Sequence, residues 1–184
     1  MKNVGIVTLF GEYNFGNRLQ NYAVQQVLKK NGFNTETIKY IGLEDDVPII
    51  HNERDENRLN KFKDFNKYIK FSDDIMYKEY EAPQKIKECY DYIVLGSDQI
   101  WNPLKTSDFS LAYMLNFTKK EKIAYAPSIG LASKDDLSPY KDLLLSFKAI
   151  SCREKGGSKV LSKITKKDVA VVLDPTLLIE KEVF

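Results

Sequence analysis

Short apolar runs alternate with amphipathic segments along this chain. Residues 4–9 form an apolar run rich in β-branched side chains, which predicts a strand that is buried on both faces. From Asn17 onward, apolar residues recur at helical spacing until Gly32, and residues 35–41 alternate as a second strand. A strand, a glycine-bearing turn, an amphipathic helix and a further strand form a βαβ unit, so the sequence predicts an α/β fold.

Further apolar runs stop abruptly in polar residues, and each predicts another buried strand. These runs cover residues 92–95, 123–126, 149–152 and 169–173. Amphipathic segments that predict helices cover residues 59–69, residues 83–89 and the stretch from Arg153 to about Ile164. Strands alternating with helices in this way predict a Rossmann-like, mostly parallel twisted sheet with helices on both faces. No linker rich in Pro, Gly or Ser interrupts the pattern, so residues 1–184 are expected to form a single domain.

The composition excludes several classes of function. The 28 Lys and Arg residues nearly balance the 26 Asp and Glu residues, so no strong field exists to attract nucleic acid. No apolar run approaches the roughly 20 residues of a membrane span, and no signal peptide precedes the first strand, so a cytoplasmic location is expected. Cys89 and Cys152 lie far apart in a chain with a single His, which argues against a metal site and favours buried thiols.

The loop after the first strand could bind an anion. Gly11 and Gly16 allow backbone N–H groups to approach a ligand, and the loop opens a helix whose positive end attracts negative charge. The spacing fits neither a dinucleotide fingerprint nor a P-loop. Two interpretations stay open: a site in which Asn14, Gly16 and Asn17 bind substrate, or a tight turn in which an Asn caps the helix.

Residues 96–103 crowd polar groups and the single Trp of the chain just beyond a predicted strand. Ligands of open α/β sheets bind at the carboxyl ends of strands, so this stretch suits a carbohydrate or phosphate. Trp101 could stack on a sugar ring while Asp98 takes a proton from a hydroxyl. The alternative is a structural turn with Trp101 in the core.

Arg153 follows another predicted strand, where its guanidinium could hold a carboxylate or a phosphate through two parallel hydrogen bonds. The alternative is a structural ion pair with Glu154 or Asp174. The neighbouring Cys152 could have its pKa lowered by this arginine, but no His is placed to act as its base, so a nucleophilic role is not expected.

Taken together, five segments resemble the polysaccharide pyruvyl transferase family. They are residues 14–23, 96–102, 124–130, 151–154 and 173–177, which read NFGNRLQNYA, GSDQIWN, AYAPSIG, SCRE and LDPTL. The resemblance covers nearly the whole chain and corresponds to the amino-terminal half of a family member. Members resemble GT-B glycosyltransferases with two Rossmann-like domains, so the second domain is expected to be absent from this chain.

The resemblance implies transfer of pyruvate from phosphoenolpyruvate onto two hydroxyls of a sugar as a ketal, in bacterial exopolysaccharide synthesis. The implied partners are phosphoenolpyruvate and a sugar or lipid-linked oligosaccharide, with no cofactor. Arg153 matches the arginine motif of the family and is the expected donor contact. The role of Asp98 as a base is expected from its place just beyond a predicted strand and not from the resemblance. The expected substrate-binding residues are Asn14, Gly16, Asn17, Ser97, Gln99, Trp101, Asn102, Ser128, Gly130, Arg153 and Glu154.

Two other functions remain as alternatives to pyruvyl transfer. One is a nucleotide-sugar-dependent glycosyltransferase domain, and the other is a non-catalytic Rossmann-like binding domain. A histidine that the family is expected to use lies in its other half, so these residues alone are expected to be inactive. A domain built to close against another should also expose apolar surface beside its site, which predicts a homo-oligomer of the isolated domain.

Overall fold

The fold is a parallel sheet of seven strands in the part of the chain that the computed structural model describes, residues 1–9, 14–41, 51–77, 86, 88–103 and 111–180. The strands are β1 (Asn3–Val7), β2 (Asn34–Ile41), β3 (Phe71–Tyr77), β4 (Tyr92–Leu95), β5 (Glu121–Ala124), β6 (Ala149–Cys152) and β7 (Ala170–Val171). Their order is β3-β2-β1-β4-β5-β6-β7, and every pairing between them is parallel. The predicted Rossmann-like α/β class is therefore confirmed.

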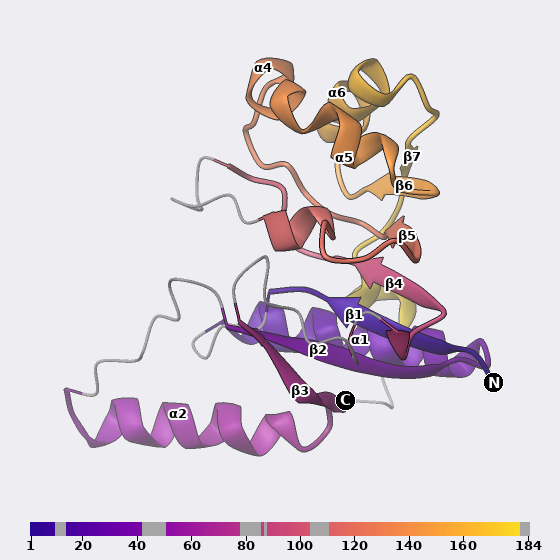
Figure 1. The fold of residues 1–184 in the computed structure, drawn as a ribbon. Helices are drawn as coiled ribbons and strands as arrows, with labels where there is room; N and C mark the ends of the chain where they lie inside the picture. The colour runs from indigo at the N-terminus through magenta and orange to yellow at the C-terminus, as the bar shows by residue number, and fades with distance from the viewer. Residues whose placement is uncertain (10–13, 42–50, 78–85, 87, 104–110, 181–184) are drawn as a thin grey trace.

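Helices cover both faces of this sheet. The α-helices are α1 (Phe15–Lys30), α2 (Glu53–Asn66), α4 (Lys134–Leu137), α5 (Lys141–Leu145) and α6 (Lys155–Thr165). Short 3₁₀ helices are η1 (Leu111–Met114), η2 (Ser138–Tyr140) and η3 (Pro175–Leu178). Figure 1 shows α1 running along β1 and β2, while α4, α5 and α6 gather beside β5, β6 and β7.

Alternation along β4 explains why two layers of helices form. Ile93 and Leu95 belong to the larger apolar cluster, together with Leu161 of α6. Val94 belongs to a second cluster, together with Val24 of α1. Because successive side chains of a strand point to opposite faces, one apolar run supplies both layers of the core.

The sequence predicted six of the strands but missed β3. This strand lies at the edge of the sheet and contains Asp73 and Asp74 in its middle, so it lacks the apolar run of a buried strand. The helix expected over residues 59–69 ends at Asn66, and Ile69 is buried in the connection that follows. The helix expected at residues 83–89 lies mostly outside the described residues.

The strand order changes direction between β1 and β4. Successive strands lead from β1 to β2 and β3 on one side, and from β4 to β7 on the other. In open α/β sheets, ligands bind in the crevice at such a switch point, outside the carboxyl ends of the strands. The fold therefore directs attention to the residues that follow β1 and β4.

Candidate functional site

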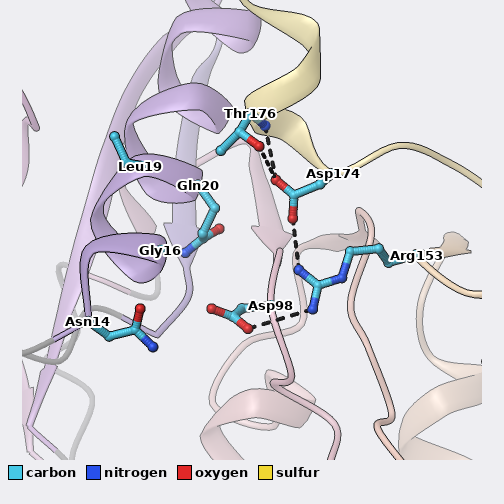
Figure 2. Close-up of a pocket in the computed structure, with 8 residues that line it drawn as sticks. All are labelled: Asn14, Gly16, Leu19, Gln20, Asp98, Arg153, Asp174 and Thr176. Carbon is cyan, nitrogen blue, oxygen red and sulfur yellow. Dashed lines mark hydrogen bonds and ion pairs between the residues drawn. The ribbon is translucent and has the colours of Figure 1, made fainter. Parts of the chain in front are cut away.

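A pocket of about 580 Å³ lies at this switch point. Four segments that follow β1, β4, β6 and β7 supply its walls. The lining residues are Asn14, Gly16, Leu19, Gln20, Asp98, Arg153, Asp174 and Thr176. Figure 2 shows the polar side chains of Asp98, Arg153 and Asp174 gathered opposite the first turns of α1.

The start of α1 forms one wall of the pocket. Asn14 is the N-cap of the helix, and its side-chain oxygen accepts a hydrogen bond from the N–H of Asn17 at 3.3 Å. Capping, which the sequence left as an alternative, is thus what the structure shows for Asn14, while Asn14 and Gly16 also line the pocket. Asn17 is buried, outside the pocket lining, and no described residue donates to its Oδ1.

Asp98 stands at the centre of the pocket with one oxygen open. Its Oδ1 accepts a hydrogen bond from the N–H of Gln99 at 2.7 Å and lies 3.7 Å from Nη2 of Arg153. No described residue donates to its Oδ2, and Figure 2 shows this carboxylate reaching into the space between Arg153 and Asn14. An acceptor oxygen that faces a pocket can receive a proton or a hydrogen bond from a substrate hydroxyl.

Arg153 lies between two carboxylates. Its Nη1 donates to Oδ2 of Asp174 at 2.8 Å, and its Nη2 is 3.7 Å from Oδ1 of Asp98. The ion pair with Asp174, which the sequence left as an alternative, is therefore present, while Glu154 instead accepts from the N–H of Ile129 at 2.9 Å. Nη2 keeps capacity for a further acceptor because 3.7 Å exceeds ordinary hydrogen-bond length.

Asp174 is held in its charged form. Burial alone would raise its pKa, but hydrogen bonds from Thr176 and Arg153 outweigh burial, so the pKa lies below its ordinary value of 3.8. Both hydrogen bonds from Thr176 reach Oδ1, at 3.0 Å from the backbone N–H and 2.7 Å from the hydroxyl. The carboxylate therefore stays ionised at neutral pH beside the guanidinium of Arg153.

Two residues predicted to bind substrate, Ser97 and Ser128, are buried outside the pocket lining and hydrogen-bond to neighbouring turns. Ser97 is fully buried and donates its hydroxyl to the carbonyl of Ala126 at 2.9 Å. Ser128 is also buried, and its N–H donates to the carbonyl of Asp98 at 2.7 Å. These bonds join the turns after β4 and β5. Both residues lie at the carboxyl edge of the sheet, as predicted, but the pocket lining does not include them.

Gln99 and Gly130 both lie beside the side chain of Asn102. Nδ2 of Asn102 donates to Oε1 of Gln99 at 3.4 Å. Gly130 has a φ of 60°, and a Cβ at this position would press on the Asn102 side chain. These residues support the turn after β4, and none of them lines the pocket.

Trp101 is a core residue, so the structure shows the alternative that the sequence left open and not a sugar platform. The ring has no exposed surface and packs edge to face on Phe147, with ring centroids 5.4 Å apart. Its Nε1 donates to the carbonyl of Tyr113 at 3.0 Å. A buried indole with its N–H satisfied stabilises the core and offers no face to a ligand.

Cys152 is buried directly before Arg153, and burial raises the pKa of its thiol to about 11. A hydrogen bond from the backbone of Arg153 does lower the pKa of this thiol, as the sequence suggested, but burial outweighs it and the net shift is upward. A thiol that stays protonated at neutral pH is a poor nucleophile, which agrees with the expectation that Cys152 has no such role.

Sequence reasoning left four pocket residues out of the predicted site: Leu19, Gln20, Asp174 and Thr176. Helical spacing gives a signal for the first two, because Leu19 and Gln20 follow Gly16 by three and four positions and so share its face. Asp174 follows a predicted strand in the same way as Asp98 and Arg153. The rule that polar residues just beyond a strand are candidate site residues would therefore also have identified Asp174.

Two further findings concern the described residues only. They contain no helix that is both long and apolar enough to cross a membrane. Nor do they contain a group of three or more His, Cys, Asp or Glu side chains placed to hold a metal ion. Leu173 and Leu177, which neighbour Asp174 and Thr176 in the chain, are exposed, and an apolar surface beside the site stays a prediction. Self-association through this surface stays a prediction.

Comparison with known proteins agrees with the motifs. No curated protein matches the chain. A family model described as "Polysaccharide pyruvyl transferase" matches residues 14–183. The matched region begins at the N-cap of α1 and includes every residue that lines the pocket. The chain therefore belongs to the polysaccharide pyruvyl transferase family.

Proposed function

We propose that this domain takes part in the transfer of pyruvate from phosphoenolpyruvate to two hydroxyls of a sugar, giving a cyclic ketal and free phosphate. The observation that carries the proposal is the placement of Arg153 and Asp98 side by side at the switch point of the sheet. One of them can bind an anionic donor, and the other can accept a proton from a hydroxyl.

Arg153 is the proposed donor contact. Its guanidinium presents Nη2 at the pocket while Nη1 is engaged by Asp174. A carboxylate or phosphate oxygen of the donor can take the place of Asp98 at Nη2, because the 3.7 Å contact to Asp98 is the weaker of the two. A charge-assisted hydrogen bond there orients the donor at the edge of the sheet.

Asp98 is the proposed base. The first sugar hydroxyl adds to C2 of phosphoenolpyruvate, its proton leaves to a base, and C3 gains a proton from an acid. The second hydroxyl then replaces phosphate at C2 and also loses its proton, which closes the ketal. Oδ2 of Asp98 is open to the pocket and can receive a hydroxyl proton.

The resemblance supplies the wider setting of this proposal. Family members have a second Rossmann-like domain across the cleft, and we assign to it the acid that protonates C3 and further cationic contacts to the donor. The two aspartates and one arginine of this pocket carry a net negative charge, so a trianionic donor needs cations from outside this lining. The acceptor is then a cell-surface polysaccharide unit assembled in the cytoplasm.

The test compares Arg153→Ala and Arg153→Lys with the wild type in the full-length protein. A charge-assisted hydrogen bond contributes about 1.5 to 3 kcal/mol, so Arg153→Ala is expected to lower kcat/KM for phosphoenolpyruvate by about 10- to 100-fold. Lysine restores the charge without the planar fork and should rescue only part of the loss. Melting temperatures of the same variants separate a lost contact from a lost fold.

A matched control is Arg54→Ala, which removes an exposed arginine from α2. It should leave kcat/KM for phosphoenolpyruvate unchanged. An Arg153→Ala enzyme that melts early but uses phosphoenolpyruvate normally at low temperature would show that Arg153 is only structural. A wild-type enzyme that ignores phosphoenolpyruvate but consumes a nucleotide sugar would make it a glycosyltransferase instead.

A further inference from the structure

Asp174 differs from Asp98 in how completely its side chain is engaged. Both oxygens of Asp174 accept hydrogen bonds: Oδ1 from Thr176, and Oδ2 from Nη1 of Arg153 at 2.8 Å. Asp98 has one oxygen open to the pocket. The two carboxylates beside Arg153 are therefore unequal, and Asp174 has the geometry of an anchor.

We propose that Asp174 is a positioning residue, which together with Thr176 fixes the guanidinium of Arg153 so that Nη2 faces the pocket. The inference rests on the proposed function, because it assigns Asp174 a role through the donor contact at Arg153. Asp174 does not touch the reacting atoms, and its effect on the reaction passes through Arg153.

The backbone beneath this contact is tied on both sides. Strands β6 and β7 pair with Cys152 opposite Val171, and the N–H of Val172 donates to the carbonyl of Cys152 at 3.0 Å. The hydroxyl of Tyr125 donates to the carbonyl of Leu173 at 3.1 Å. The chain directly before Asp174 is thus joined to the turn that carries Arg153, which limits how far the two side chains can separate.

Asp174 directly precedes η3, and this short helix packs against α1. Asp174 caps this short helix through the N–H of Thr176, so the residue that orients Arg153 also starts the segment that closes one side of the pocket. Figure 2 shows this arrangement, with Thr176 above Asp174 and Arg153 below it. Both Arg153 and Asp174 are largely sheltered, with side-chain exposures of 29% and 21%, so their pairing is less screened than a surface ion pair.

If the Asp174 carboxylate were lost, Asp98 would be the one remaining carboxylate within 4 Å of Arg153 among the described residues. The guanidinium is then free to turn toward Asp98 and form a closer pair. Such a pair would occupy both the donor contact and the proposed base. Asp174 therefore has two effects: it holds the guanidinium of Arg153 in place, and it keeps Arg153 from pairing closely with Asp98.

The test is a double-mutant cycle in the full-length protein, using phosphoenolpyruvate as the donor. Asp174→Asn is expected to lower kcat/KM for phosphoenolpyruvate about tenfold in the wild-type background, with the acceptor KM within about twofold. In the Arg153→Ala background the same substitution should change kcat/KM less than about twofold, because its route to the donor is already lost. Thr176→Val, which removes only the hydroxyl bond to Asp174, should give a smaller loss of the same kind.

The control is Glu121→Gln, a carboxylate paired with Lys148 at the opposite end of the sheet, which should leave all kinetic constants unchanged. Equal losses from Asp174→Asn in both backgrounds would show a role independent of Arg153 and overturn the inference. The inference would also be overturned if the Asp174→Asn and Thr176→Val enzymes were both as active as the wild type. If the wild type does not use phosphoenolpyruvate at all, the proposed function fails, and this inference fails with it.

Discussion

The side-chain oxygen of Gln20 accepts a hydrogen bond from the backbone N–H of Ser97 at 2.8 Å, which ties α1 to the turn after β4. The Nε2 of Gln20 donates to the Thr8 hydroxyl at 2.6 Å and to the carbonyl of Asn17 at 3.0 Å. One buried amide therefore joins the ends of β1 and β4 to the first turns of α1. It fixes the width of the crevice in which the pocket lies.

We expect Gln20→Leu to lower the free energy of unfolding by about 3 kcal/mol, because the buried Ser97 N–H would lose its acceptor and the buried Thr8 hydroxyl would lose a donor. Urea denaturation of the domain measures this loss. Gln26→Leu on the same helix is the control, since this side chain is only half-buried and should cost less than about 1 kcal/mol. Equal costs at the two positions would mean that the Gln20 bonds contribute no net stability.

Three glycines offer a graded test of backbone strain in this fold. Gly96 has a φ of 115°, and a Cβ there would collide with the carbonyl oxygen of Tyr125. Gly32 has a φ of 83° but open space around it, and Gly156 lies in α6 with open space and an ordinary φ. The three positions thus separate a steric clash from conformational strain alone.

We expect Gly156→Ala to stabilise the domain by about 0.5 to 1 kcal/mol, because alanine is the better helix former. Gly32→Ala should cost about 1 to 2 kcal/mol from strain. Gly96→Ala should cost more than either and leave little folded protein, since the strand end must move away from β5. Melting temperatures and soluble yields report this order, and a soluble Gly96→Ala domain with wild-type stability would contradict the geometry at the end of β4.

The sequence predicted the central strands well because their physical signal is local. A run such as residues 92–95 is apolar on both faces and stops at Gly96 and Ser97, so its place in the sheet could be inferred from the pattern alone. The direction in which each residue points after the strand ends has no such signal. Ser97 turns into the core while the next residue, Asp98, turns to the pocket, and a φ of 80° at Asp98 accompanies that change.

The same limit explains Trp101 and Asp174. Composition alone could not distinguish a ligand platform from a core ring at Trp101, because the outcome depends on Phe147, which lies far along the chain. The contact between Arg153 and Asp174 joins residues 21 positions apart, and it depends on the register of β6 and β7. Contacts across strands are fixed by tertiary structure, whereas strand ends are visible in the sequence.

The two cysteines should differ in reactivity. Cys89 is exposed, so the expectation that both thiols are buried is wrong for this residue, whereas Cys152 is buried with its pKa raised to about 11. A thiol reagent at about pH 8 should therefore modify one thiol of the native protein rapidly and the second only after unfolding. Cys89→Ser should remove the rapid phase. Rapid modification of the native Cys89→Ser protein would mean that Cys152 is accessible as a thiolate.

Because Asp174 pairs with Arg153, part of the free energy of unfolding should depend on pH. Burial raises the pKa of Asp174, but hydrogen bonds from Thr176 and Arg153 outweigh it, so the folded-state pKa lies below the ordinary value of 3.8. Such a group stabilises the fold above its unfolded pKa, and the contribution is lost as pH falls through the lower, folded pKa. An uncharged amide in place of this carboxylate could not make that contribution at any pH.

We therefore expect Asp174→Asn to be less stable than the wild type by about 2 kcal/mol at about pH 6, with a gap that narrows steadily below about pH 4. Urea titrations of both proteins from about pH 3 to about pH 7 measure the gap. Glu121→Gln, which removes an exposed carboxylate from Lys148, should cost less than about 1 kcal/mol because solvent screens that pair. A gap for Asp174→Asn that stays constant down to about pH 3 would show that the gap does not arise from ionisation of Asp174, and the ion pair with Arg153 would then not be its source.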